Sequence, residues 1–401
     1  MSIESEQARA QKKDLQTPVA AVQPTKASLE RSRLLFLDNL RAVLIMLVIA
    51  GHVAIVYGSA GSWVYTEPTQ DMVAIIILSI FTATGQAFIM GLFFLIAGYL
   101  TPGSYDRKGA AAFEKGRLLR LGIPLLIYDL FINPFVGYVA TGFPRPYWEF
   151  YSDYLLHFGG IGRGPLWFVE ALLIFSSVYV IWRWLSRHRI KNTASVRQLP
   201  TYRAILLFIF ALAVVTFVIR IWLPLGWTFE PLNFQLPFFA QYISFFVLGI
   251  IAYHRDWFLR IHNSMGRTWL WIAIGAILLL PIMILAGGGV EHPEFLWGGI
   301  HWQAFAYALW ESIVCVGMNI GLLVFFRRHV NRQGKWGKFL AANAYGAYIL
   351  QAPVIVCVAY AAQDIHLYPL LKFALAVLVM VPLCFVASDL IRKLPFARKI
   401  L

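Results

Sequence analysis

Charged residues are scarce in this chain of 401 residues. Only 13 % of the residues are charged, whereas 59 % are hydrophobic. A soluble domain carries about 25 % charged and about 45–50 % apolar residues, so this balance excludes an ordinary soluble globular protein. The composition instead predicts an all-α fold, a polytopic bundle of helices that cross a membrane.

Cysteine is also rare, and several signatures are missing. The three cysteines, Cys315, Cys357 and Cys384, lie inside apolar segments without the spacing of a disulfide framework or a metal site. The chain has no Walker sequence, no glycine-rich dinucleotide fingerprint and no His-Glu-x-x-His motif. It also lacks the internal repeat of many transporters. We therefore expect no metal site.

Long apolar runs are abundant, and their lengths predict ten membrane-spanning helices. The second run is long enough to indicate a tilt, or a break near Thr84 and Gly85. The expected spans are approximately residues 36–57, 72–100, 120–140, 165–185, 203–223, 237–253, 268–286, 302–325, 339–361 and 369–391.

Basic residues give the chain a net charge of +14, and their distribution predicts its orientation across the membrane. They gather in alternate connections and in both tails, with these exceptions: Arg41, Arg145, Arg163, Arg220 and Lys372. Because cytoplasmic connections carry the excess of Lys and Arg, both termini are predicted to be cytosolic, in a multi-pass protein of the inner cell membrane. The positive charge is thus expected at the cytosolic membrane surface, where membrane lipids are its neighbours. It indicates no nucleic-acid partner.

Three segments follow from this pattern. Residues 1–33 are polar and predict a disordered cytosolic tail. Residues 34–395 form the predicted transmembrane domain, and residues 396–401 a short basic C-terminal tail.

The outer connections combine carboxylates with aromatic rings. Aromatic residues at a membrane surface commonly form an interfacial belt. Carboxylates between flat rings would also suit a polyhydroxylated ligand, and both interpretations stay open. The residues are Glu67, Asp71, Glu149, Asp153, Glu230, Glu291, His292 and Glu294, among Trp63, Tyr65, Tyr147, Trp148, Tyr151, Trp227, Phe229 and Trp297.

The first apolar run carries two ionisable side chains, Arg41 and His52. Eleven residues turn a helix by about three full turns, so both side chains project from one face, about 16 Å apart along the axis. Ionisable groups at such depth usually mark a functional path. The alternative is a hydrogen-bonded core histidine with an arginine that reaches the membrane surface.

Three further ionisable residues could likewise have either a functional or a structural role. Arg117 and Arg120 are neighbours on a helix face and could bind phosphate, or could simply mark the cytosolic side. Glu170 lies at about the same depth as His52, roughly 8 Å from the outer surface. It could orient the imidazole as the third member of a triad does, or stabilise the start of its own helix.

Several motifs resemble the acyltransferase-3 family of membrane O-acyltransferases. The first is Leu37-Asp38-Asn39-Leu40-Arg41 with ten residues before His52. Others are Phe93 to Leu100, which includes Tyr99; Gly116 to Pro124; Gly164 to Glu170, which includes Trp167; and Asn343 to Pro353. The chain departs from the last motif because Gln351 stands where histidine is common. A second catalytic histidine is therefore not expected there.

The resemblance implies a reaction and a set of roles. An acyl group, usually acetyl, would pass from acyl-CoA (acetyl-CoA in the usual case) to a hydroxyl of a glucan or other extracytoplasmic glycan. Arg41, Arg117 and Arg120 would hold the CoA phosphates. His52 would act as general base, with direct transfer or an acyl-histidine both open, and Glu170 would assist it. Asp38, Trp167 and Tyr99 would have orienting, structural roles.

Two other functions remain possible from the sequence. A transporter of a small solute would use Arg41, His52, Glu170, Arg220 and Glu311 as an intramembrane path. A flippase-like or structural partner of a glycan assembly complex is the weaker alternative.

Overall fold

The computed structural model describes residues 34–157, 164–186, 198–230, 232–289 and 291–400. The chain divides into two units, Met1–Leu34 and Leu35–Leu401, and every helix below belongs to the second. The predicted tail at residues 1–33 lies outside the described residues, as do Arg163 and the basic residues between 187 and 197.

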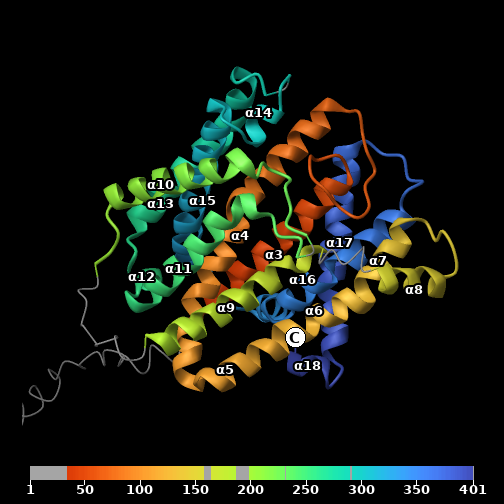
Figure 1. The fold of residues 1–401 in the computed structure, drawn as a ribbon, viewed down its shortest axis with the longest axis horizontal. Coiled ribbons are helices and arrows are strands. Elements are labelled where there is room, and N and C mark those ends of the chain that lie inside the picture. Colours follow the sequence, from red (N-terminus) through yellow and green to blue (C-terminus); the bar gives the residue numbers. More distant parts are fainter. Residues whose placement is uncertain (1–33, 158–163, 187–197, 231, 290, 401) are drawn as a thin grey trace, which may run out of the picture. The chain divides into compact units, whose positions relative to one another are not determined.

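The described residues are helical and contain no strand, only an isolated bridge between Phe229 and Phe234 (Figure 1). The long helices are α3 (Leu35–Val56), α4 (Met72–Lys108), α9 (Trp167–Leu185), α10 (Tyr202–Trp222), α11 (Phe239–His254), α13 (Asn263–Ala286), α15 (Trp302–His329), α16 (Lys335–Ala361) and α17 (Pro369–Arg392). Shorter elements are α5 (Ala110–Arg117), η2 (Leu118–Gly122), α6 (Ile123–Ile127), η3 (Tyr128–Ile132), α7 (Asn133–Ala140), α8 (Tyr147–His157), η4 (Gly164–Leu166), η5 (Leu236–Phe238), α12 (Trp257–Arg260), α14 (Glu294–Trp297) and α18 (Ala397–Ile400).

Ten helical segments within the described residues are long and apolar enough to cross a membrane, which confirms the expected polytopic helix bundle. Two boundaries differ most from the sequence-based prediction. The second span is one unbroken helix of 37 residues, α4, which runs through Thr84 and Gly85 and ends at Lys108. The third span begins at Ala110, directly after Gly109, whose positive φ of 76° permits the change of direction.

The third span is irregular because of two prolines. Its five elements include two π-helical turns, η2 and η3. In each turn the closing N–H, of Ile123 or Asn133, bonds a carbonyl five residues earlier, and the next residue is Pro124 or Pro134. Because proline has no N–H to continue the regular pattern, the wider turn fits there. Single π turns are frequent at functional sites, and η2 carries Arg120.

Helices α4 and α11 cross at very close range (Figure 1). A Cβ on Gly98 would overlap the carbonyl oxygen of Phe246, and one on Gly249 would overlap that of Leu95. Small residues permit such an approach between membrane helices. Tyr99 continues the contact, because its ring stacks on Phe258 of α12 with 4.0 Å between centroids. Tyr99 thus packs α4 against α12, and its structural role at the site stays a prediction.

Helix α3 lies against α4, α15, α16 and α17. Most of its apolar side chains are buried, including Leu40, Ile49 and Val53. Its beginning is tied to the α15–α16 connection, because Asn39 donates to the carbonyls of Val330 and Arg332. The helix that carries Arg41 and His52 is therefore surrounded by other helices.

Candidate functional site

His52 is held by a residue from the far end of the chain. Its Nδ1 is 2.9 Å from Oε1 of Gln351, on α16. An amide oxygen can only accept a hydrogen bond, so Nδ1 carries the hydrogen and donates it. The neutral ring then keeps its lone pair on Nε2, the state that a general base requires. Gln351 is fully buried, which holds its amide in place.

A second contact with the imidazole of His52 comes from the α3–α4 connection. The ring of Trp63 stacks on the imidazole of His52, with 4.0 Å between centroids and an interplanar angle of 20°. The connection is anchored on both sides of Trp63. The Ser59 and Thr82 hydroxyls are 2.6 Å apart, and Glu67 forms an ion pair with Lys372 of α17.

The phenol of Tyr65 stays neutral near this ion pair. Burial, followed by the neighbouring Glu67 carboxylate, raises the pKa of Tyr65 to about 12. The α3–α4 connection thus holds the Trp63 ring over one face of the imidazole.

Glu170 lies in the first turn of α9 and is only 8 % exposed. The start of α9 packs on α16 one turn away from Gln351: Tyr348 donates to the carbonyl of Pro165, and its ring contacts Phe168. In the structure, Nδ1 of His52 forms its hydrogen bond with Gln351. The expected assistance of His52 by Glu170 therefore stays a prediction.

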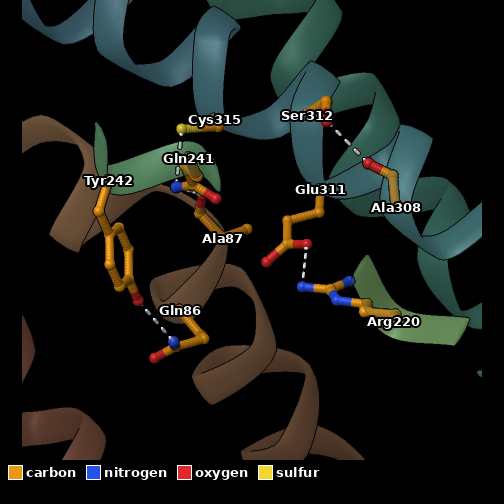
Figure 2. Close-up of polar contacts among 9 residues, drawn as sticks. All are labelled: Gln86, Ala87, Arg220, Gln241, Tyr242, Ala308, Glu311, Ser312 and Cys315. Atoms are coloured by element: carbon orange, nitrogen blue, oxygen red, sulfur yellow. Dashed lines mark hydrogen bonds and ion pairs between the residues drawn. The ribbon is translucent and has the colours of Figure 1, made fainter. Parts of the chain in front are cut away.

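Trp167, beside Glu170, faces a different partner. Its ring stacks on Tyr242 of α11, with 5.4 Å between centroids. The Tyr242 hydroxyl in turn accepts a hydrogen bond of 3.1 Å from Gln86 of α4 (Figure 2). Trp167 therefore joins α9 to α4 and α11.

The three arginines expected to bind phosphate come together at the other end of α3. The guanidinium of Arg117 lies close enough to those of Arg41 and Arg120 to repel both electrostatically. Asp38 is one carboxylate near them, 3.9 Å from Arg41. Three clustered guanidiniums are the groups that phosphate oxygens prefer.

Helix α16 connects the arginine cluster with His52. Tyr345 donates a 2.7 Å hydrogen bond to the carbonyl of Arg120, Tyr348 follows three residues later, and Gln351 three after that. Six residues advance a helix by about 9 Å. One helix thus contacts the arginine segment, the start of α9 and the imidazole.

A second polar cluster lies between α4, α10, α11 and α15 (Figure 2). Arg220 is fully buried and its Nη2 is 2.7 Å from Oε2 of Glu311. Gln241 donates to the Ala87 carbonyl at 2.8 Å and to Sγ of Cys315 at 3.0 Å. In the part of the chain that the structure describes, no group of three or more His, Cys, Asp or Glu side chains has a metal-binding arrangement.

Two residues at His52 were not identified as site residues from the sequence. In the sequence, Gln351 is only a departure from a motif, and Trp63 is only one of the outer aromatic residues. The signal for Gln351 was its motif position, because a residue that replaces histidine at a site still occupies that site. Trp63 gave no signal of its own.

Comparison with known proteins shows which proteins this chain is similar to. The family model described as acyltransferase domain matches residues 34–389. Glucans biosynthesis protein C of Salmonella paratyphi B and of Salmonella enteritidis are each 28 % identical to this chain over 241 residues. That match covers 57 % of this chain and 61 % of the relatives, so the chain spans less than two thirds of their length. No solved structure matches it.

Proposed function

Because the chain belongs to this acyltransferase family, we propose that it is a multi-pass membrane O-acyltransferase. It moves an acyl group, acetyl in the first instance, from acyl-CoA at one membrane surface to a glycan hydroxyl at the other. The observation that carries the proposal is the imidazole of His52, whose Nδ1 is bound to Gln351. The name of the relatives supports a glucan as the acceptor.

The acceptor hydroxyl, the thioester and His52 account for every atom and electron pair in the proposed step. Nε2 of His52 takes the proton of the acceptor hydroxyl as its oxygen attacks the thioester carbonyl carbon. The carbon–sulfur bond breaks, and the CoA sulfur leaves with the proton that the imidazolium returns. An ester and a free thiol result.

The donor occupies the arginine end of the bundle. Arg117, Arg120 and Arg41 bind the CoA phosphates, and Asp38 orients Arg41. The extended arm of CoA then spans the distance to His52, about 16 Å along α3. Glu170 and Trp167 contribute at the start of α9, where Glu170 favours the protonated imidazole during the step.

The proposed topology places both termini in the cytosol, in the inner cell membrane. It rests on the alternation of basic residues between connections. A cytosolic donor would then serve an acceptor outside the cytosol.

Single cysteines test this topology. Asn331→Cys lies in the α15–α16 connection and Asp364→Cys in the α16–α17 connection, and both native residues are exposed. An impermeant maleimide applied to intact cells should label position 364 and spare position 331, with the parent chain as background. Labelling of position 331 alone would contradict the proposed orientation and the donor side.

Replacement of Arg117 and Arg120 by Gln tests the donor site. Each lost charge-assisted contact should weaken donor binding by about 1.5–3 kcal/mol, or roughly 10- to 150-fold. We expect a raised KM for acyl-CoA and a measurable rate at saturation. Arg203→Gln, an exposed arginine at the start of α10, is the matched control. An unchanged KM in the double variant would leave these arginines as topology determinants only.

The function itself is tested with labelled acetyl-CoA. Membranes that contain the protein should transfer label to added glucan, and membranes without it should not. If label never reaches glucan or any other glycan fraction, the proposed function is wrong.

A transporter is the second candidate, since the buried Arg220–Glu311 pair is the kind of intramembrane charge found on transport paths. Uptake of a solute that depends on Glu311, with acyl transfer absent, would favour it.

A further inference from the structure

A cavity of about 280 Å³ lies where the start of α13 meets the end of α15. The two helices lie side by side (Figure 1), and a glycine on each lets them approach closely. A Cβ on Gly266 would overlap Val324, and one on Gly321 would overlap Leu270. The cavity is thus bordered by two facing helix surfaces, and its lining residues are separate from those of the proposed transfer site.

The charged lining of this cavity is basic. Arg267 comes from α13, and Arg328 and His329 come from α15. Of the residues described, those that line the cavity include no carboxylate, and neither Arg267 nor Arg328 has an ion-pair partner in the described part of the chain. Two guanidiniums that share a cavity repel each other, and an anion between them would remove that repulsion. Phosphate oxygens match the fork of donors on arginine.

Arginines at the end of a membrane helix can also serve only to mark the cytosolic side. Arg327 has a use within the protein, because its guanidinium donates to the carbonyls of Phe258 and Ile261. Arg328, the next residue, has no such acceptor among the described residues and lines the cavity instead. A topological role requires basic charge but no shared cavity, so the convergence of these side chains on one cavity favours a ligand.

The rest of the lining is largely apolar and faces the periphery of the helix bundle. Leu270 and Phe325 lie further from the helix ends than the two arginines do, and Phe325 is 43 % exposed. Along α13, Trp271 and Leu278 are 65 % and 71 % exposed. In a membrane-spanning helix, large apolar side chains that no other helix covers contact lipid tails. The cavity therefore combines a basic end with an apolar end toward the lipid.

We propose that this cavity binds the head group of an anionic phospholipid. The lipid phosphate lies between Arg267 and Arg328, and its acyl chains begin against Leu270 and Phe325. Basic pockets between membrane helices on the cytoplasmic side bind anionic head groups. Asn39 at the start of α3 bonds the α15–α16 connection, so the cavity lies toward the membrane surface of the proposed donor site. The inference does not depend on the acyl transfer.

Binding of labelled phosphatidylglycerol to the full-length protein in a fixed detergent tests the site. The variant combines Arg267→Gln with Arg328→Gln. A basic residue near an anionic lipid contributes about 1 kcal/mol, or about fivefold, so we expect about 25-fold weaker binding by the double variant. The matched control combines Arg203→Gln with Lys335→Gln, two exposed basic residues at the starts of α10 and α16, and should bind as the wild type does.

The lipid site is overturned if the wild type shows no saturable binding, or if the Arg267 and Arg328 double variant binds as the wild type does. An equal loss in the control would show a general effect of surface charge. Displacement of the lipid by inorganic phosphate or acetyl-CoA at equal concentration would make the cavity a site for soluble phosphates, and equal binding of phosphatidylcholine would contradict the role of charge. If the double variant does not fold, Arg328→Gln alone decides, with about fivefold weaker binding expected.

Discussion

His52→Gln and His52→Ala should abolish acyl transfer in membranes that bind acyl-CoA as the wild type does. A general base contributes about 10²–10⁴ in rate, and neither replacement can take up a proton near neutral pH. Because the arginine cluster lies at the other end of α3, about 16 Å from His52 along the axis, donor binding should be retained.

The measurement pairs donor binding with the transfer rate for each variant. His366→Gln is the matched control, since His366 lies exposed in the α16–α17 connection and should transfer at the wild-type rate. Substantial glycan acylation by His52→Gln would mean that His52 is a structural histidine bound to Gln351.

Arg220→Met should destabilise the protein severely. Arg220 and Glu311 are both buried, with 2.7 Å between Nη2 and Oε2 (Figure 2). Removal of one partner leaves the other charge buried and uncompensated, at a cost of about 3–5 kcal/mol. The measurement is thermal unfolding in a fixed detergent.

The double variant Arg220→Met, Glu311→Met separates pairing from packing. It should recover most of the lost stability, because apolar replacements of similar volume are often neutral. Arg183→Met is the control: its pair with Asp106 is partly exposed and should contribute under about 1 kcal/mol. A double variant as unstable as Arg220→Met would show that the guanidinium matters for another reason, such as its place over the Phe238 ring.

The number of spans could be predicted from apolar length, but their ends could not. The second span was expected to end near residue 100, and α4 continues through Pro102 to Lys108. Proline is tolerated in membrane helices where neighbours satisfy the freed carbonyl, and this depends on tertiary contacts. The π turns of the third span likewise depend on the spacing of Pro124 and Pro134, which length and hydropathy do not register.

The candidate site was only partly predictable for a related reason. Periodicity placed Arg41 and His52 on one face of one helix. It gave no information on which residue of another helix meets that face, and the partner of His52 is Gln351, 299 positions away. The stacked Trp63 lies in an irregular connection, where no periodicity exists.

The proposed transfer runs from a cytosolic donor to an acceptor on the other side of the membrane. Sealed inside-out vesicles with glucan enclosed in the lumen, supplied with labelled acetyl-CoA from outside, test it most directly. We predict that label appears on the enclosed glucan, and that it does not in vesicles of His52→Gln. Label confined to the outside, or enclosed glucan labelled equally by His52→Gln, would contradict the account.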